Sequence, residues 1–365
     1  MDATALDSIG LLTELVAQNT VSGEPGAQRH VMDVVASVVR ARHPRVEVQG
    51  DAGGPHPWML LTNEAPSEAA RLMFACHVDT VPPGDLANWQ FDPFAADVED
   101  GLLLGRGTSD MKAGVVAAVA AVIDAVAHGS PVALLLTSDE EIGSLGARAA
   151  QGAVSEKNIG AVVVPEATGN RIHLGHRGAL WLDVTTKGVA AHGSTPQRGE
   201  NAIFKLVDVL GRARRELPLS KDSFLGDETF NVGLIHGGSA PNIVPDAASV
   251  VVDHRTVGDG GDLVRWWRAQ PEVDRVEARI DLPGVQTPGG DAWVGSLPTS
   301  VASEPVTYFT DASILAEAAP GAPIVVWGPG TPALMHAADE SVSLTELDDA
   351  TVAYTATALA WRAVD

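Results

Sequence analysis

The stretch PVALLLTSDEEIGSLGARAA, residues 131–150, reads as a buried strand, a short loop and the start of a helix. Residues 132–136 are all apolar, which is typical of a strand that is covered on both faces. The loop then places two adjacent acids, Glu140 and Glu141, just beyond this apolar run. Adjacent like charges repel each other, so such a pair at the edge of a core indicates a specific role.

Three further segments join an apolar strand to a loop: RLMFACHVDTVPPG (71–84), GLLLGRGTSDMKAG (101–114) and IGAVVVPEATG (159–169). Apolar strands that alternate with helices, such as the Ala/Val-rich helix expected at 113–127, predict an α/β fold with a mixed, mostly parallel sheet between helices. Ligands of such sheets bind beyond the carboxyl ends of the strands. At the four strand ends, expected in one sheet, the chain carries His77, Asp79, Asp110, Glu140, Glu141 and Glu166.

The pattern changes near residue 177. Residues 179–193 alternate apolar and polar side chains, as an antiparallel strand with one solvated face does. A helix near 200–216, two strand-like runs, a helix at 261–269 and a last strand follow, which makes a βαββαβ unit of about a hundred residues. We therefore predict a catalytic domain formed by 1–176 and 284–365, interrupted by an inserted α+β domain at 177–283.

Composition excludes several classes of function. The net charge is −23, from 24 basic and 47 acidic residues without a basic cluster, which argues against nucleic acid and anionic membranes as partners. Cys76 is the only cysteine, so an intramolecular disulfide and a thiolate metal cluster are excluded. The longest apolar stretch, 113–127, is too short to span a bilayer, and the first twenty residues carry acids where a signal peptide carries basic residues. We expect a cytoplasmic protein.

The ionisable residues are ambiguous one by one. His77 and Asp79 are two apart, which suits a metal ligand and the carboxylate that orients it, but a strand-end histidine often has no such role. Asp110 precedes a helix and could equally be a plain N-cap. Together with Glu166 and His336 they form a set of nitrogen and oxygen ligands that fits a two-metal centre. Zinc suits this set best, and cobalt or manganese would also fit.

Six ordered motifs, HVDTVP, GRGTSDMKAG, TSDEEIGS, VPEAT, AHGSTP and MHAADE, resemble those of the co-catalytic metallopeptidases and deacylases. This family includes carboxypeptidase G, aminoacylase, acetylornithine deacetylase and succinyl-diaminopimelate desuccinylase. The resemblance runs over nearly the whole chain, and it implies a zinc-peptidase-like catalytic domain with a lid that also forms a homodimer. It further implies two divalent metal ions per chain: Asp110 would bridge them, Glu141 and His336 would complete one site, and His77 and Glu166 the other.

The resemblance also implies the catalytic groups. Asp79 would orient His77. Glu140 would be the general base that takes a proton from the water between the metals, which becomes the metal-bridged hydroxide, and passes this proton to the leaving amine. His192, in AHGSTP, would donate a hydrogen bond to the developing oxyanion, usually from the partner subunit of the dimer. Without this context His192 would read as a surface histidine in a loop.

Four residues are candidates for binding substrate. The segment GGSAPNIVPDAASVVVDHR resembles the family segment that holds a substrate carboxylate, and the resemblance assigns this role to Asn242 and Arg255. An arginine guanidinium can bind a carboxylate through two parallel hydrogen bonds. A surface ion pair is the alternative for Arg255. Arg177, at the junction with the lid, is a candidate of the same kind. Thr310 lies in TDAS, at the place of a family loop that touches substrate.

The function expected from this pattern is a metal-dependent amidohydrolase that removes an acyl group from an N-acyl amino acid. A dipeptidase or glutamate-type carboxypeptidase with the same centre is the alternative, because a free carboxylate on the leaving amino acid serves both reactions and the motifs do not separate them. A binding protein that kept the scaffold and lost the chemistry is a more remote one. The loop TYFTDAS (307–313) departs from the Gly-Gly-Thr-Ser-Asp form of desuccinylases, which leaves the acyl group open.

Overall fold

The computed structural model describes residues 6–51, 53–66 and 68–361. The chain divides into two compact units, and the second comprises His176–Val285 together with Thr307–Phe309. The first unit is formed by the chain up to residue 175, by residues 286–306 and by the chain from residue 310 onward. The two short strands β8 (Gly175–His176) and β15 (Val285–Gln286) lie where the chain passes between the units. The inserted domain expected from the sequence ran from 177 to 283.

A six-stranded sheet forms the centre of the first unit, in the order β1–β2–β6–β3–β7–β16. Four strands are parallel to one another: β6 (Val132–Thr137), β3 (Arg71–His77), β7 (Ile159–Val164) and β16 (Ile324–Val326). The antiparallel strands β2 (Trp58–Thr62) and β1 (Glu47–Asp51) extend one edge and were not anticipated from the sequence. The prediction of a mixed, mostly parallel sheet is confirmed.

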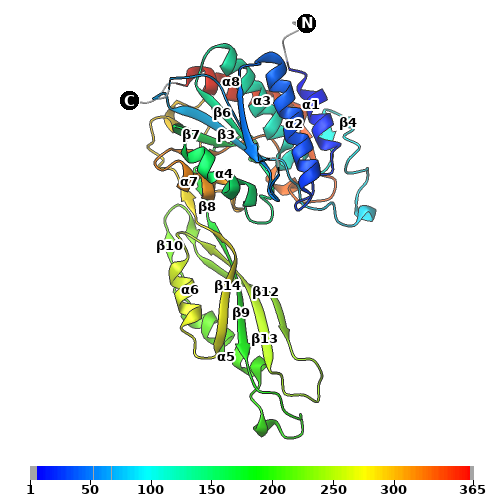
Figure 1. The fold of residues 1–365 in the computed structure, drawn as a ribbon, viewed down its shortest axis with the longest axis vertical. Helices are drawn as coiled ribbons and strands as arrows, with labels where there is room; N and C mark the ends of the chain where they lie inside the picture. The colour runs from blue at the N-terminus through cyan, green and yellow to red at the C-terminus, as the bar shows by residue number, and fades with distance from the viewer. Residues whose placement is uncertain (1–5, 52, 67, 362–365) are drawn as a thin grey trace. The chain divides into compact units, whose positions relative to one another are not determined.

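Helices cover this sheet on both faces. Figure 1 shows one group formed by α1 (Ser8–Val16), α2 (Pro25–Arg42), α3 (Ala113–Ala127) and α8 (Leu344–Ala360), and a second group formed by α4 (Leu145–Ser155) and α7 (Ala312–Ala318). Residues 72–77 of β3 are therefore all buried, as the unbroken apolar run predicts. Among the described residues, no helix has the length and apolar character that crossing a membrane requires.

The strand before Asp110 does not belong to the central sheet, so the expectation that all four strand ends share one sheet was wrong in this respect. Strand β5 (Leu102–Leu104) lies between β17 (Ser341–Ser343) and β4 (Val98–Glu99) in a separate three-stranded sheet. Asp110 lies in η2 (Thr108–Lys112), a single turn of π-helix that leads into α3, and the peptide bond between Asp110 and Met111 is cis. Asp110 thus comes to the site from the start of a helix.

The second unit has a four-stranded antiparallel sheet in the order β12–β13–β9–β14. Its main elements follow one another as predicted: β9 (Gly178–Lys187), α5 (Ala202–Glu216), β12 (Thr229–Gly237), β13 (Ala247–Thr256), α6 (Gly261–Arg268) and β14 (Val273–Leu282). Two short strands, β10 (Lys221–Asp222) and β11 (Gly226–Asp227), were not predicted. Both helices pack on one face of the sheet, where Leu182 of β9, Val252 of β13 and Trp267 of α6 belong to one buried cluster. The opposite face carries the polar side chains of the alternation.

Candidate metal centre

The five predicted metal ligands come from five segments of the first unit. His77 is the last residue of β3, and Glu141 and Glu166 follow the neighbouring strands β6 and β7. These strands are parallel, and His77 pairs in register with the last residue of β6, so their carboxyl ends meet at one edge. Asp110 joins them from η2, and His336 from the loop after the short helix η5 (Pro332–Leu334).

Asp110 lies between the two histidines. Its Oδ1 is 3.1 Å from Nε2 of His77, and its Oδ2 is 3.1 Å from Nε2 of His336. Glu166 Oε1 lies 3.5 Å from Nε2 of His77, and Glu141 Oε2 lies 2.9 Å from Nε2 of His336. Two groups of three result, each with its ligand atoms within 4.8 Å of one another, and Asp110 belongs to both. A carboxylate shared in this way can offer one oxygen to each of two ions.

The carboxylates of this cluster carry more negative charge than the chain compensates. Burial, with the charge of Asp110 beside it, raises the pKa of Glu141 to about 7. Burial and the same neighbour raise the pKa of Glu166 to about 7, although His77 acts in the opposite direction. Oε2 of Glu166 and Oε1 of Glu140 are buried and have no hydrogen-bond partner among the described residues. The cluster is mostly buried, and only the side chain of His336 is exposed, at 51%. Its imidazole nitrogens and its carboxylate oxygens, two of them without a partner, fit two divalent cations.

The histidines respond to the same field. Burial alone would lower the pKa of His77, but Glu166, Asp110 and Asp79 outweigh it and raise the pKa well above its usual value. Hydrogen bonds to Asp110 and Glu141 raise the pKa of His336 to about 10. In the metal-free protein, protons on these side chains therefore balance part of the negative charge that a cation would balance. Metal binding must release these protons. The backbone of His336 has a φ of 62°, in the left-handed region that non-glycine residues adopt infrequently.

Asp79 has a wider role than orienting His77. Nδ1 of His77 lies 3.0 Å from the backbone oxygen of Asp79 and 3.6 Å from its carboxylate Oδ1. The same Oδ1 accepts a hydrogen bond from the backbone N–H of Glu140 at 3.1 Å, and Oδ2 accepts one from Ser22 Oγ at 2.7 Å. The carboxylate therefore links the histidine to the loop that carries both glutamates, which the H-x-D spacing alone did not indicate.

Glu140 is 4% exposed and lies within the field of the cluster. Burial raises its pKa well above the usual value, and Glu141, Glu166 and Asp311 add to this effect while His77 opposes it. A buried carboxylate that binds protons so readily is suited to proton transfer near neutral pH.

The residue before Glu140 fixes this loop from the other side. Asp139, fully buried with a φ of 54°, accepts hydrogen bonds from the backbone N–H of Gly23 at 2.7 Å and from Gln28 Nε2 at 3.2 Å, and its Oδ2 lies 2.7 Å from His56 Nδ1. Asp139 is not among the site residues predicted from the sequence. Its partners lie in the turn before α2, in α2 itself and in the β1–β2 connection, all far from Asp139 in the sequence. The one local signal of Asp139 is its place in the acidic run SDEE, directly before Glu140.

Thr310 is buried just before α7, where its Oγ1 accepts a hydrogen bond from the backbone N–H of Ala312 at 3.1 Å. The next residue, Asp311, was also missed. It accepts a hydrogen bond from Thr137 Oγ1, at the end of β6, at 2.6 Å. Burial raises the pKa of Asp311 to about 6, although the hydrogen bond from Thr137 lowers it. The loop TYFTDAS therefore brings a second acid toward the strand end that precedes Glu140.

In the second unit, His192 and Asn242 lie next to each other. A bridge pairs His192 with Ile243, and the backbone N–H of Gly193 donates to the backbone oxygen of Asn242 at 2.7 Å. The side chain of His192 is exposed, and its Nδ1 accepts a hydrogen bond from the backbone N–H of Ser194 at 3.1 Å. An accepting Nδ1 places the proton of a neutral imidazole on Nε2, which leaves that nitrogen as a donor.

Arg255 and Arg177 lie at the other end of the same sheet. Arg255 Nε is 3.1 Å from Asp253 Oδ1, and its Nη2 donates to Oδ2 at 3.2 Å. Arg255 therefore forms an ion pair on its own strand, which is the alternative considered for it from the sequence. Arg177 Nη1 donates to the backbone oxygen of Asp227 at 2.9 Å. The ten residues of β9, at about 3.3 Å each, put about 30 Å between this pair and the pair formed by His192 and Asn242. One chain therefore does not bring Asn242 and Arg255 together.

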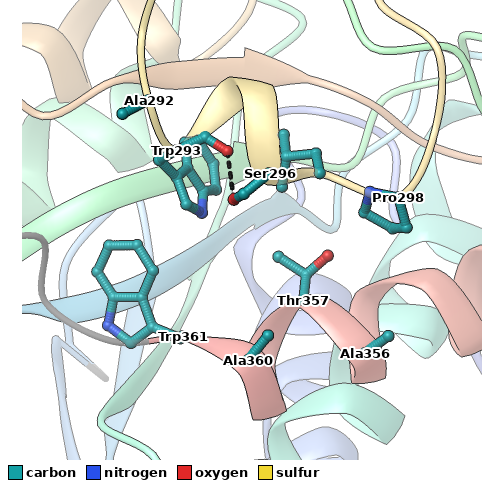
Figure 2. A pocket seen from close by; sticks show the side chains of 9 residues that line it. Ala292, Trp293, Ser296, Pro298, Ala356, Thr357, Ala360 and Trp361 are labelled. Atoms are coloured by element: carbon teal, nitrogen blue, oxygen red, sulfur yellow. Dashed lines mark hydrogen bonds between the residues drawn. The ribbon is translucent and has the colours of Figure 1, made fainter.

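A pocket of about 330 Å³ elsewhere in the first unit has a different character. Figure 2 shows that Trp293, next to the short helix η4 (Val294–Ser296), and Trp361, just after α8, line it. Their rings meet edge to face, with centroids 6.0 Å apart. The residues that line this pocket include no titratable side chain, so it offers no group for acid–base or metal chemistry.

Known proteins are similar to this chain in sequence and in fold. The profile of the peptidase family M20/M25/M40 matches residues 73–360. A succinyl-diaminopimelate desuccinylase from Maricaulis maris (strain MCS10) is 31% identical over 315 residues, which cover 78% of this chain and 79% of the relative.

Two solved structures support the fold. An M20 family metallo-carboxypeptidase from Sulfolobus solfataricus has a TM-score of 0.80 at 16% identity, over 97% of this chain and 99% of its own. A protein from Bacillus subtilis described as a dinuclear metal-binding peptidase of the M20 family has a TM-score of 0.69 at 13% identity, over 98% of each chain. The matching profile, the relative and the arrangement of the two ligand groups lead to one conclusion: the chain belongs to the peptidase family M20/M25/M40 and is a hydrolase of amide bonds.

Proposed function

We propose that this enzyme removes an acyl group from an N-acyl amino acid and that it depends on two divalent metal ions. The observation that carries the proposal is Asp110, which presents one oxygen to each of two histidines beside the buried Glu140. The similarity to a desuccinylase supports an acyl amino acid as substrate. A cytoplasmic location is part of the proposal, on the compositional grounds given above.

The residues that would hold the ions are His77, Asp110 and Glu166 for one, and Asp110, Glu141 and His336 for the other. Zinc suits this donor set best, with cobalt and manganese as further candidates. When bound, such a pair lowers the pKa of a water molecule and polarises the amide carbonyl.

The chain itself supplies the proton transfer. Glu140 would accept the proton that the attacking water loses as its oxygen bonds to the carbonyl carbon. The same carboxyl would deliver this proton to the amide nitrogen while the C–N bond breaks, which releases a free amine and a carboxylic acid. The acid then loses its remaining proton to solvent and becomes a carboxylate. Asp79 keeps Glu140 in place through the hydrogen bond from the backbone N–H of Glu140.

The substrate carboxylate would bind to Arg255, whose guanidinium is held in a fixed orientation by Asp253 and keeps further N–H groups for a ligand. Arg177, at the same end of the sheet, would contribute a second positive charge. Asn242 would be a further polar contact for the substrate, and Thr310 would contact it from the first unit.

The inserted domain supports a homodimer. Strand β12 is at the edge of its sheet, and Leu234 and Ile235 on it are exposed, as are Phe204 and Val207 on α5. An apolar edge strand is a template for pairing with another chain, so we propose that β12 and α5 form a two-fold interface with a second copy. The separation of about 30 Å along β9 supports this reading. An N-acyl amino acid is much shorter, so both pairs of candidates can reach one substrate only if they come from two chains.

The decisive test of the reaction is a substrate panel with protein reconstituted with zinc or cobalt. N-acetyl and N-succinyl amino acids should be hydrolysed with a kcat/KM at least about tenfold above that of dipeptides with the same leaving amino acid, a difference of about 1.4 kcal/mol. Faster hydrolysis of the dipeptides would establish the peptidase alternative. If the protein bound far fewer than two ions and hydrolysed neither class, the binding-protein alternative would stand.

A further inference from the structure

Glu340 is a fully buried carboxylate four residues beyond His336. Among the described residues, its carboxylate oxygens accept hydrogen bonds from the segment 106–110. Its Oε1 accepts hydrogen bonds from the backbone N–H groups of Ser109 at 2.9 Å and of Asp110 at 3.0 Å. Its Oε2 accepts from the backbone N–H of Gly107 at 3.0 Å and from Arg106 Nη1 at 2.6 Å. One carboxylate therefore holds the backbone that carries Asp110.

Arg106 extends this connection to the loop of His336. It is 2% exposed, its guanidinium carbon lies 5.1 Å from the centre of the Trp89 ring, and Nη2 donates to the backbone oxygen of His336 at 3.5 Å. Two further bonds join the same segments: the backbone N–H of Gly105 donates to the backbone oxygen of Glu340 at 2.9 Å, and Ser109 Oγ donates to that of Ser341 at 2.7 Å.

The segment 107–110 needs these acceptors. Gly107 has a φ of 84°, and Asp110 has non-helical angles inside η2, so a regular helix does not satisfy the N–H groups there. A buried N–H without an acceptor is costly, and the segment would shift to find one if the carboxylate were lost. Such a shift would move Asp110, whose two oxygens each lie 3.1 Å from a different histidine.

We propose that Glu340 is a positioning residue for the metal centre. It holds the segment of Asp110 and, through Arg106, the loop of His336, so that each carboxylate oxygen of Asp110 stays 3.1 Å from one of the two histidines that would share the ions with it. This inference rests on the proposed function, because it takes Asp110 and His336 as ligands. Glu340 is not a member of either ligand group, and its side chain contacts Asp110 only at the backbone N–H. It would act through its four donors rather than as a ligand.

Glu340→Gln is the sharpest variant, because an amide has nearly the same shape but only one acceptor oxygen. The amide nitrogen would face either the two N–H groups at Oε1 or the donors at Oε2. Glu228→Gln is the matched control: Glu228 is also buried and accepts backbone hydrogen bonds from Ser220 at 2.9 Å and Val257 at 3.1 Å, in the second unit.

The experiment measures Zn²⁺ affinity by competition with a chelator, and the visible spectrum of the Co²⁺-loaded full-length protein. Glu340→Gln should bind at least one ion about 10–100-fold more weakly and show an altered Co²⁺ spectrum, while Glu228→Gln matches the wild type. If Glu340→Gln does not fold, Glu340→Asp keeps the charge but shortens its reach, and it should show the same direction of change.

Three results separate the possible failures. Unchanged Zn²⁺ affinity and an unchanged Co²⁺ spectrum in a folded Glu340 variant would overturn the inference, even if that variant melted at a lower temperature. Equal losses in the Glu340 and Glu228 variants would overturn it too, since a general loss of stability would then explain both. A wild-type protein that binds no divalent ion would refute the proposed function instead.

Discussion

The metal centre of the first unit and the candidate substrate residues of the inserted domain differ in whether their charged and polar atoms find partners within the chain. In the first unit, five ligands from five segments form two groups that share Asp110, and Glu166 keeps a buried oxygen without a partner among the described residues. In the inserted domain, Arg255 has Asp253, and His192 has Ser194. Charge that the chain leaves uncompensated indicates a ligand directly. Residues with partners of their own need a second molecule to reveal a role.

Glu140→Gln should have the largest effect on turnover. The amide cannot accept a proton from water, so kcat should fall by about 10³-fold, within the range known for general bases, while two ions remain bound. Metal content and steady-state kinetics measure both quantities. Glu141→Gln is the matched variant at the adjacent position and should lose an ion instead. The reverse outcome, with metal lost from Glu140→Gln and retained in Glu141→Gln, would show that the two glutamates have each other's role.

His192→Ala should lower kcat by about 100-fold, as the loss of an oxyanion donor does, and should leave the metal content unchanged. The two-chain site can be tested by mixing this variant with Glu140→Gln. Hybrid dimers would contain one site with both residues intact, so random reassociation should restore roughly a quarter of wild-type activity. No recovery in hybrids shown to form would contradict a site shared between two chains.

The comparison also explains what the sequence could predict. The apolar strands ending at His77 and before Glu141 and Glu166 identify the central sheet, and parallel strands bring such ends together by geometry alone. The antiparallel pair β1–β2 was missed, since EVQGD over 47–51 is too polar to indicate a strand.

The contacts around the site could not be predicted in the same way. Glu340 reaches Asp110 across more than two hundred residues of sequence, and Asp139 reaches Gly23 and His56 in the same manner. Such bonds depend on where loops pack, and neither motif spacing nor periodicity encodes that. The resemblance supplied the roles of Asp110 and His336, and the strand for Asp110 was still placed in the wrong sheet.

Arg255→Met should raise KM about 10–100-fold for substrates with a free carboxylate and change kcat much less, because a binding contact is lost. The same amino acid with its carboxylate amidated should be hydrolysed poorly by wild type and variant alike. Arg279→Met is the matched control, since Arg279 Nη2 donates to Asp183 Oδ1 at 2.8 Å within the same sheet. If both variants kept the wild-type KM, Arg255 would be a structural ion pair only.

The smallest expected effect concerns stability without metal. The pKa of Glu141 and of Glu166 is raised from 4.5 to about 7, so the folded metal-free protein binds protons more tightly than the unfolded chain does. This contribution is fully present below pH 4.5 and is lost as the pH rises through about 7. The melting temperature of the metal-free protein should therefore fall by roughly 5 °C between pH 5 and pH 8, and saturating zinc should reduce this fall.

Calorimetric melting in the presence of a chelator measures this slope, and the double variant Glu141→Gln/Glu166→Gln isolates its cause. The whole chain has a net charge of −23, so general repulsion also grows as the pH rises. That repulsion would persist in the double variant, whereas the contribution of the two carboxyls would vanish and leave a flatter profile. An equal slope in both proteins would mean that the buried carboxyls of Glu141 and Glu166 contribute little to the pH dependence of stability. The negative charge of the cluster would then be balanced within the chain, without a cation.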